Sequence, residues 1–296
     1  MKIEVKPGIY VVAVSGGVDS MALLDLLSKQ PGHKLIVAHF DHGIREDSLA
    51  DRKLVQDVTR RHGHPFVYDE GKMGFGTSEE SARKARYDFL HSVRKSSGAH
   101  AVITAHHQDD LLETAVHNLL RGTGRKGLVS LRSRKNLHRP LLDIPKSDLI
   151  AYAKDQGLVW REDSTNADLR FRRNYIRHKI LPKFSHEQKQ ELLQHIRKMR
   201  NLDADIDNEL VNHLHLHPNF SELDRHWFIM LPHSVAKEIL AEWLRRHRIK
   251  DISNKMLERL VTAAKTYRPG KITDVDDKYI FEISKQTLKL VKKVQI

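Results

Sequence analysis

The sequence contains no cysteine, which excludes disulfide bonds, thiolate metal sites and cysteine nucleophiles. It has no apolar run that approaches the ~20 residues of a membrane-spanning helix. Its charged start and brief first apolar run do not resemble a signal peptide, so we expect a cytoplasmic protein with no membrane partner. Acidic residues are fewer than basic ones, 38 against 51, and the formal net charge is +13. This excess favours a polyanionic partner, above all a nucleic acid.

The length and periodicity predict three parts. A chain of 296 residues is long enough for one large domain and a smaller one. We expect a catalytic domain over 1–185, a connecting helix over 186–217 and a C-terminal domain over 218–296. Apolar residues at spacings of three and four, such as Leu192, Ile196 and Met199, predict the long helix. The last part begins with helical patterns and ends in short alternating strands, which predicts a small α+β domain.

Strands and helices alternate in the first part. Apolar runs over 9–14, 35–40, 65–68 and 101–104 predict strands, and helices are expected between and after them. Repeated β–α units predict an α/β fold with a parallel, doubly wound sheet. Ligands of such sheets lie beyond the carboxyl ends of the strands. Polar loops follow three of these strands, at 15–20, 41–45 and 105–110, and we expect them to border one site.

The first of these loops has the composition of a nucleotide site. Its glycines permit backbone conformations closed to other residues and leave room for a ligand. The N–H groups at the start of the following helix attract anions. No lysine follows the glycines, so the loop is not of the G-x-x-x-x-G-K-S/T type, and it is not G-x-G-x-x-G either. A purely structural turn is the alternative. We predict a nucleotide-binding loop made of Ser15, Gly16, Gly17, Val18, Asp19 and Ser20.

The segment 106–114 is the densest chemical cluster. If its helix begins near Gln108, Asp110 and Glu113 lie three residues apart on one face and can bind an amine or Mg²⁺. The alternative is an acidic helix start that the helix dipole favours. Two adjacent histidines lack the i, i+4 spacing of a zinc helix, so zinc is disfavoured. Arg83 and Arg86 share a helical face, either as a solvated surface or near a phosphate or carboxylate.

Taken in order, the motifs resemble one enzyme family. SGGVDS resembles the pyrophosphate loop of the PP-loop ATP pyrophosphatases, whose fold is of the adenine nucleotide α-hydrolase type. With DHGIR, ARKARYDFL, AHHQDDLLET, RGTGRKGL, HRPLL, WREDSTN and RFRRNYIR, the chain resembles the tRNA(Ile)-lysidine synthetases over roughly 9–183. The resemblance implies that lysine is ligated to C2 of the wobble cytidine, position 34, of tRNA(Ile) with a CAU anticodon. ATP would adenylate the cytidine and yield AMP and pyrophosphate. The lysidine formed would change codon specificity from AUG to AUA and amino-acid specificity from Met to Ile.

The resemblance also implies roles for individual residues. ATP with Mg²⁺ would bind at 15–20, and L-lysine would bind at Asp110 and Glu113, with Arg86 on its carboxylate. Catalytic roles are implied for Asp41, His42, Asp110 and His106, and the acceptor of the lysine proton is left open among Asp41, His42 and His106. No protein ligand for the metal is assigned, and a homodimer is plausible. Contacts to tRNA phosphates are implied for Arg121, Arg125, Lys126, Arg172, Arg173 and Arg177, together with the C-terminal domain.

Two other classes of function compete with this reading. One is a different PP-loop ligase, either a tRNA thiolase or an ammonia-dependent synthetase of a small molecule. The missing cysteines argue against the first, and the basic composition argues against the second. The other class is a nucleotide-sensing RNA-binding protein without catalysis, which the complete SGGVDS and HHQDDLLET motifs disfavour.

Overall fold

The computed structural model describes residues 1–41, 43, 48–71, 79–123, 125–162, 168–170, 172–215, 222–249 and 252–293. The chain forms two compact units: unit 1 comprises 1–117 and 130–193, and unit 2 comprises 118–129 and 194–296. The boundaries between them fall inside or near two helices, α4 (Gln108–Leu120) and α8 (His186–His215). The segment 118–129 belongs to unit 2, although it lies within the range predicted for the catalytic domain. None of the described helices is long and apolar enough to cross a membrane.

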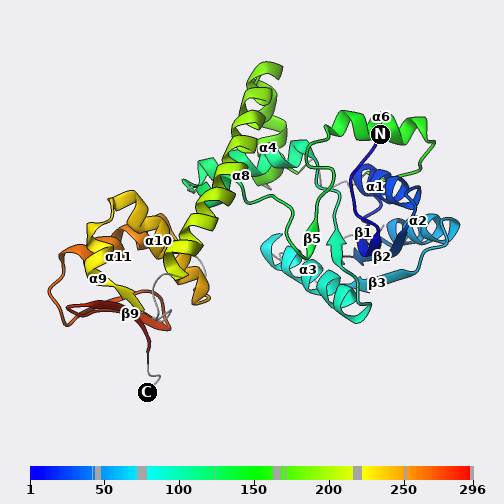
Figure 1. Ribbon diagram of the computed structural model, residues 1–296. Coiled ribbons are helices and arrows are strands. Elements are labelled where there is room, and N and C mark those ends of the chain that lie inside the picture. Colours follow the sequence, from blue (N-terminus) through cyan, green and yellow to red (C-terminus); the bar gives the residue numbers. More distant parts are fainter. Residues whose placement is uncertain are drawn as a thin grey trace. The chain divides into compact units, whose positions relative to one another are not determined.

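Unit 1 is built on a five-stranded parallel sheet with the strand order β3-β2-β1-β4-β5 (Figure 1). The predicted parallel, doubly wound sheet is therefore confirmed. Four strands match the apolar runs of the sequence, and the fifth is a two-residue strand that the sequence did not indicate. The strands are β1 (Gly8–Ala13), β2 (His33–Asp41), β3 (Phe66–Glu70), β4 (Ala101–Ile103) and β5 (Leu137–His138).

Helices cover both faces of this sheet (Figure 1). On one face, Val12 packs in a core with Leu23 and Leu149, and on the other Val11 packs with Leu90. Both faces of β1 are thus buried, which explains its unbroken apolar run. The first face carries α1 (Val18–Ser28), α2 (Ser48–Arg61) and α6 (Lys146–Asp155), and the second carries α3 (Glu79–Ser96). Short turns, α7 (Arg172–Tyr175), η2 (Ile176–Ile180) and η3 (Leu181–Lys183), lead into α8.

The chain reverses its direction across the sheet at β1. From β1 it moves outward through β2 to β3, and it then returns to place β4 on the other side of β1. The loops after β1 and β4 therefore diverge from neighbouring strands, and such a switch point is where parallel sheets leave a crevice for ligands. The 15–20 loop follows β1, and the two histidines follow β4.

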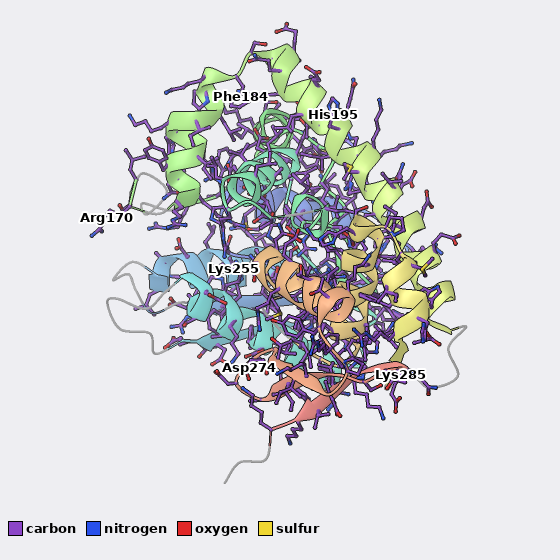
Figure 2. All side chains as sticks on the ribbon, turned by 90° about the vertical axis from the view of Figure 1, so that its left-hand side faces the viewer. Arg170, Phe184, His195, Lys255, Asp274 and Lys285 are labelled. Atoms are coloured by element: carbon purple, nitrogen blue, oxygen red, sulfur yellow. The ribbon has the colours of Figure 1, made fainter. Side chains whose placement is uncertain are left out.

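Unit 2 packs helices on a four-stranded antiparallel sheet with the order β6-β9-β8-β7. Its core joins Trp243, Phe228 and Phe281, all of which are fully buried. Exposed cations such as Lys255 and Lys285 project outward from it (Figure 2). The elements are β6 (Glu222–Asp224), α9 (Arg225–Met230), α10 (His233–Arg246), α11 (Asn254–Thr266), β7 (Lys271–Asp274), β8 (Tyr279–Ile283) and β9 (Thr287–Lys292).

A buried arginine ties these elements of unit 2 together. The Arg225 guanidinium donates hydrogen bonds to the carbonyl oxygens of Ala264 at 3.0 Å, Ser284 at 2.9 Å and Tyr267 at 2.5 Å. Arg225 is 9% exposed, so these bonds replace the water that it loses. One side chain thereby joins α9 to the end of α11 and to the β8–β9 turn.

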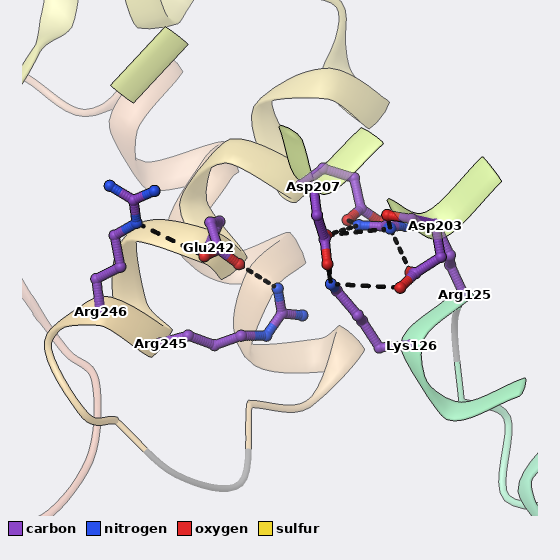
Figure 3. A network of polar contacts seen from close by, with 8 residues as sticks. Arg125, Lys126, Asp203, Asp207, Glu242, Arg245 and Arg246 are labelled. Atoms are coloured by element: carbon purple, nitrogen blue, oxygen red, sulfur yellow. Dashed lines mark hydrogen bonds and ion pairs between the residues drawn. The ribbon is translucent and has the colours of Figure 1, made fainter. Parts of the chain in front are cut away.

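An ion-pair network fastens the segment 118–129 to the helices of unit 2 (Figure 3). Arg125, at the start of α5 (Arg125–Leu128), pairs with Asp203, with Asp207 at 3.3 Å and with Glu238 at 2.7 Å. Lys126 pairs with Asp207 and lies 3.6 Å from Asp203. The Asp203 side chain is 0% exposed and that of Arg125 is 9% exposed. Because Asp203 and Arg125 are buried together, removing either charge would leave the other desolvated without its partner.

Candidate functional site

The turn that follows β1 is closed by serine hydrogen bonds. Gly16 has a φ of 96°, a conformation that glycine adopts without strain. The hydroxyl of Ser20 donates to the Gly17 carbonyl at 2.9 Å and accepts from the Ser15 N–H at 3.2 Å. Gly17 is the N-cap residue of the 11-residue helix α1, and it has no side chain to cap the first N–H groups of the helix, which face the turn. The 15–20 loop thus ends at a helix start, the kind of position that favours an anion.

The same loop is held from a distant part of the sequence. Arg161 donates from its backbone N–H to the Gly16 carbonyl at 3.0 Å, and its side chain pairs with Asp51 at 2.6 Å. A Cβ placed on Gly17 would meet the Ser15 hydroxyl at 3.7 Å and the Arg161 carbonyl oxygen at 3.9 Å, which is ordinary van der Waals contact. Contacts from residues 51 and 161 thus hold the loop that follows β1.

His107 lies at the centre of three carboxylates. Its Nε2 is 3.5 Å from the carboxylate oxygens of Asp19 and of Asp110, and its Nδ1 is 3.6 Å from Asp109. The side chain is almost completely buried. Burial alone would lower the pKa of His107, but these carboxylates outweigh it and raise the pKa to about 10. His107 is therefore a cation at neutral pH.

Lys146 joins this cluster from α6. Its backbone N–H donates to Asp109 at 2.9 Å, and its ammonium lies 3.5 Å from Asp19. His107 and the Lys146 N–H lower the pKa of Asp109 to about 2, so Asp109 is ionised. Asp19 Oδ1 and His107 Nδ1 are buried without a hydrogen-bond partner. His107 Nδ1 faces Asp109 at 3.6 Å, whereas Asp19 Oδ1 keeps its capacity to accept a contact.

A cavity of about 160 Å³ adjoins the His107 cluster. On its wall Arg177 binds both oxygens of Glu113, at 2.5 and 2.9 Å, and lies 3.8 Å from Asp110. Burial raises the pKa of Glu113, and the Arg177 guanidinium opposes this rise. Charges of both signs therefore face the cavity. It is lined by Asp109, Leu112, Glu113, Lys146, Arg177, Leu181, Pro182 and Lys189.

His106 has surroundings opposite to those of its neighbour. It is bonded at 2.8 Å to the Thr104 hydroxyl through Nδ1. Burial and the guanidinium groups of Arg139, Arg86, Arg83 and Arg173 hold the pKa of His106 well below its usual 6.5. His106 is therefore neutral at pH 7, whereas His107 is charged.

The arrangement of sheet, loop and cluster has a counterpart among known families. The model of the PP-loop domain matches residues 3–184. The chain belongs to the PP-loop family. The match covers the strands of the parallel sheet, the 15–20 loop and the His107 cluster, so the fold and use of ATP that the sequence predicted agree with it.

Relatives of this PP-loop protein carry a more specific name. A tRNA(Ile)-lysidine synthase of Thermotoga sp. (strain RQ2) is 43% identical over 182 residues, which are 58% of this chain and 44% of that protein. One from Thermosipho africanus is 35% identical over 216 residues, 68% of this chain and 50% of that protein. The chain thus spans about half the length of these relatives. Among solved structures, a U34-tRNA thiolase from Methanococcus maripaludis is 15% identical with a TM-score of 0.45, over 85% of this chain and 76% of that one.

The other predicted residues lie in several places. Asp41 ends β2, is buried and accepts a hydrogen bond from the Gly43 N–H at 2.8 Å. His42 and Arg45 lie outside the described residues. Arg121 and Arg172 are exposed, and Arg173 is half-buried on α7. Arg125 and Lys126 belong to the ion-pair network of unit 2, and Arg177 belongs to the PP-loop site itself.

Four residues of this PP-loop site escaped the sequence reasoning. His107 stood beside His106 in the motif, and the sequence did not show which of the two would be buried among carboxylates. Lys146 follows Pro145 in a segment without a chemical pattern. Arg161 lay in the WREDSTN motif and Arg139 in the HRPLL motif, but neither was given a role. Among the described residues no group of three or more His, Asp or Glu side chains has the geometry of a metal site.

Proposed function

We propose that this protein ligates L-lysine to C2 of the wobble cytidine, position 34, of tRNA(Ile) with a CAU anticodon. ATP would adenylate the cytidine oxygen, and lysine would then expel AMP, giving lysidine, AMP and pyrophosphate. The product would read AUA instead of AUG and carry Ile instead of Met. The observation that carries the proposal is the cavity of mixed charge that shares Lys146 with the nucleotide loop. Its carboxylates and cations complement an amino acid that bears both charges. The names of the relatives support the same reaction.

For ATP, the proposed contacts are the backbone and hydroxyl groups of the 15–20 loop and the Lys146 ammonium. The Ser20 hydroxyl bonds to the Gly17 carbonyl and the Arg161 N–H to the Gly16 carbonyl, so the loop conformation is fixed by hydrogen bonds of the protein itself. Bound Mg²⁺ would stabilise the charge of the departing pyrophosphate. Asp19 is the residue that we propose to hold it, because its buried Oδ1 has no partner and carboxylate oxygen is the donor that Mg²⁺ prefers.

For lysine, we propose that Asp110 and Glu113 receive the ammonium groups. Arg177 now neutralises both carboxylates, so a lysine cation would share or replace this contact. The resemblance implied Arg86 for the carboxylate of lysine. Arg86 does not line this cavity, so we propose that the carboxylate meets the cations that do, Lys146 and Lys189. Because Glu113 is 2% exposed, the pairing would take place away from water, where it is strongest.

The attacking amine has to lose a proton, since the pKa of a lysine side chain is about 10.4. The proposed acceptor is one of Asp41, His42 and His106. His106 is kept neutral by the cations around it, which leaves a ring nitrogen able to accept a proton. The cytidine also has to leave the anticodon stack, at a cost of a few kcal/mol.

We propose that tRNA phosphates contact the exposed Arg121 and Arg172 and the half-buried Arg173, together with the C-terminal domain. Arg125 and Lys126 would contact tRNA only if a phosphate replaced the carboxylates of their ion pairs. A homodimer is part of the same proposal, and sedimentation of the protein would test it.

The test is incorporation of labelled lysine into a tRNA with a CAU anticodon. We expect incorporation that depends on ATP and is lost in Asp110→Ala. Asp148→Ala, which removes an exposed carboxylate from the same unit, should retain it. A folded protein that binds ATP but incorporates no lysine would refute the proposal. Pyrophosphate release without tRNA would indicate a ligase of small molecules instead.

A further inference from the structure

A cluster of guanidinium groups lies beside His106, at the same edge of the sheet as the proposed active site. Arg83 and Arg86 come from α3, Arg139 follows β5 and Arg173 comes from α7. Arg83 and Arg86 both lie over the Tyr87 ring, and all four guanidinium groups lower the pKa of His106. We call these four residues the guanidinium cluster. The reaction proposed above gives Arg173 a tRNA phosphate and assigns no substrate group to Arg83 or Arg139.

Arg139 is buried, and Arg83, Arg86 and Arg173 are half-buried. Arg139 is 6% exposed, and its Nε has no hydrogen-bond partner. Arg86 Nε and the Tyr87 hydroxyl are likewise buried without a partner. Within the part of the chain that the structure describes, no carboxylate lies at ion-pair distance from Arg83, Arg86 or Arg139. Burying like charges together is costly unless a group of opposite charge joins them.

Tyr87 sets the geometry of the cluster. The guanidinium carbons of Arg83 and Arg86 lie 4.9 and 5.4 Å from the centre of its ring. Stacking against the ring fixes the planes of both groups and leaves their N–H edges available. Burial raises the pKa of Tyr87, but the cations of Arg83, Arg86 and Arg139 outweigh this and lower it. The Tyr87 hydroxyl is therefore a good donor beside two guanidinium groups.

The charge of the cluster distinguishes its ligand from lysine. The cavity at Glu113 contains charges of both signs and is complementary to an amino acid. The guanidinium cluster contains cations alone among its described members, and the forked donors of arginine match the oxygens of phosphate. Helix α3, which carries Arg83 and Arg86, also packs on the opposite face of the sheet from α1 and α6, which carry Ser20 and Lys146 of the proposed nucleotide site.

We propose that Arg86, Arg139 and Tyr87, together with Arg83, bind a backbone phosphate of the RNA strand beside the target base. This assignment rests on the proposed function, because it takes RNA as the substrate. The phosphate would supply the missing counter-ion of Arg86 and Arg139 and would hold the strand at the edge of the sheet next to His106. Phosphate could also come from ATP, and the experiment separates the two sources.

The test compares Arg86→Gln with Lys84→Gln, which removes an exposed positive charge from the same helix. Affinity for tRNA is measured by filter binding at several salt concentrations, beside the Kd of ATP and the KM of lysine. A hydrogen bond from a charged group contributes enough binding free energy that its loss in Arg86→Gln should raise the Kd of tRNA about tenfold. We also expect the salt slope to fall by roughly one phosphate contact. Lys84→Gln should change the Kd of tRNA less than twofold, and Arg86→Lys should lie between the two.

Three results would overturn the assignment. An unchanged Kd of tRNA with a raised KM of lysine would place the lysine carboxylate at Arg86. A raised Kd of ATP alone would place the nucleotide there. Equal effects of Arg86→Gln and Lys84→Gln would show that the cluster is only a charged surface. Circular dichroism verifies folding, and Tyr87→Phe, which removes one hydroxyl, provides a second variant that should weaken tRNA binding. Weaker tRNA binding in a protein that incorporates no lysine would keep this assignment while refuting the proposed reaction.

Discussion

The substitution Asp203→Asn tests whether the ion-pair network holds the segment 118–129 in unit 2. Asn keeps the shape of the side chain and removes its charge. The Asp203 side chain is 0% exposed and faces Arg125 and Lys126, so the change leaves two cations with one partner fewer. Asp205→Asn makes the same chemical change at an exposed position of α8 and serves as the control.

The expected loss follows from the burial of the pair. Removing one partner of a buried ion pair costs about 3–5 kcal/mol, because the remaining charge stays desolvated. Arg125 keeps Asp207 at 3.3 Å and Glu238 at 2.7 Å, so the lower part of this range applies. We expect Asp203→Asn to lower the free energy of unfolding of unit 2 by about 3 kcal/mol. The exposed control should change it by less than about 0.5 kcal/mol.

Urea unfolding followed by tryptophan fluorescence measures this difference. Trp227 and Trp243 belong to unit 2, and Trp160 belongs to unit 1, so all variants carry Trp160→Phe. The fluorescence then reports on unit 2 alone. Replacing both partners, in Arg125→Met with Asp203→Leu, should recover much of the loss, since an apolar pair needs no counter-charge. A loss in Asp203→Asn no larger than in Asp205→Asn would refute the network as a source of stability.

Three further predictions concern single residues. The pKa of His107 is about 10 in the folded chain, against 6.5 for a free histidine. The charge of His107 therefore contributes fully to the free energy of unfolding below pH 6.5, and this contribution is lost as the pH rises to 10. The difference in unfolding free energy between the wild type and His107→Gln should shrink over this range, and a constant difference would contradict the prediction. Gly16→Ala places a side chain on a residue with a φ of 96° and should lower the free energy of unfolding by about 1–2 kcal/mol, measured by thermal melting. Gly17→Ala should leave the stability unchanged and weaken the binding of ATP, measured by calorimetry. Arg225→Met leaves buried carbonyl oxygens without donors and should destabilise unit 2 by about 3 kcal/mol in urea, while an effect below 1 kcal/mol would mean that water replaces the guanidinium.

The sequence predicted those parts of the fold that depend on neighbouring residues. The unbroken apolar run of β1 and the periodicity of α4 and α8 are local patterns, and each element appears within about two residues of its expected position. Strand β5 has two residues and pairs with β4 because of its place in the fold, so no local pattern marks it. The same is true of β6, which exists through its partner β9.

The site divides in the same way. Asp110 and Glu113 share a helix turn, so their common position near Arg177 followed from their spacing. The charge of His107 depends on Asp19, which lies 88 residues earlier in the chain, and no local signal carries this information. The basic residues Arg125 and Lys126 were recognisable as cations, but the carboxylates that hold them lie 78 to 113 residues away. Sequence spacing predicts the chemistry within an element and leaves its partners open.

The division of unit 2 into two stretches of sequence has a consequence for synthesis on the ribosome. Arg125 emerges before the residue that completes its network, Glu238, which lies 113 residues later. At 5–20 residues per second, translation leaves Arg125 without Asp203 for about 4–16 s and without Glu238 for about 6–23 s. At first Arg125 and Lys126 are hydrated cations on a nascent chain that carries four strands of the parallel sheet, and β5 follows within the same interval. Unit 1 can thus fold first. The segment 118–129 then joins unit 2 only in the last folding step, after the rest of that unit has been synthesised.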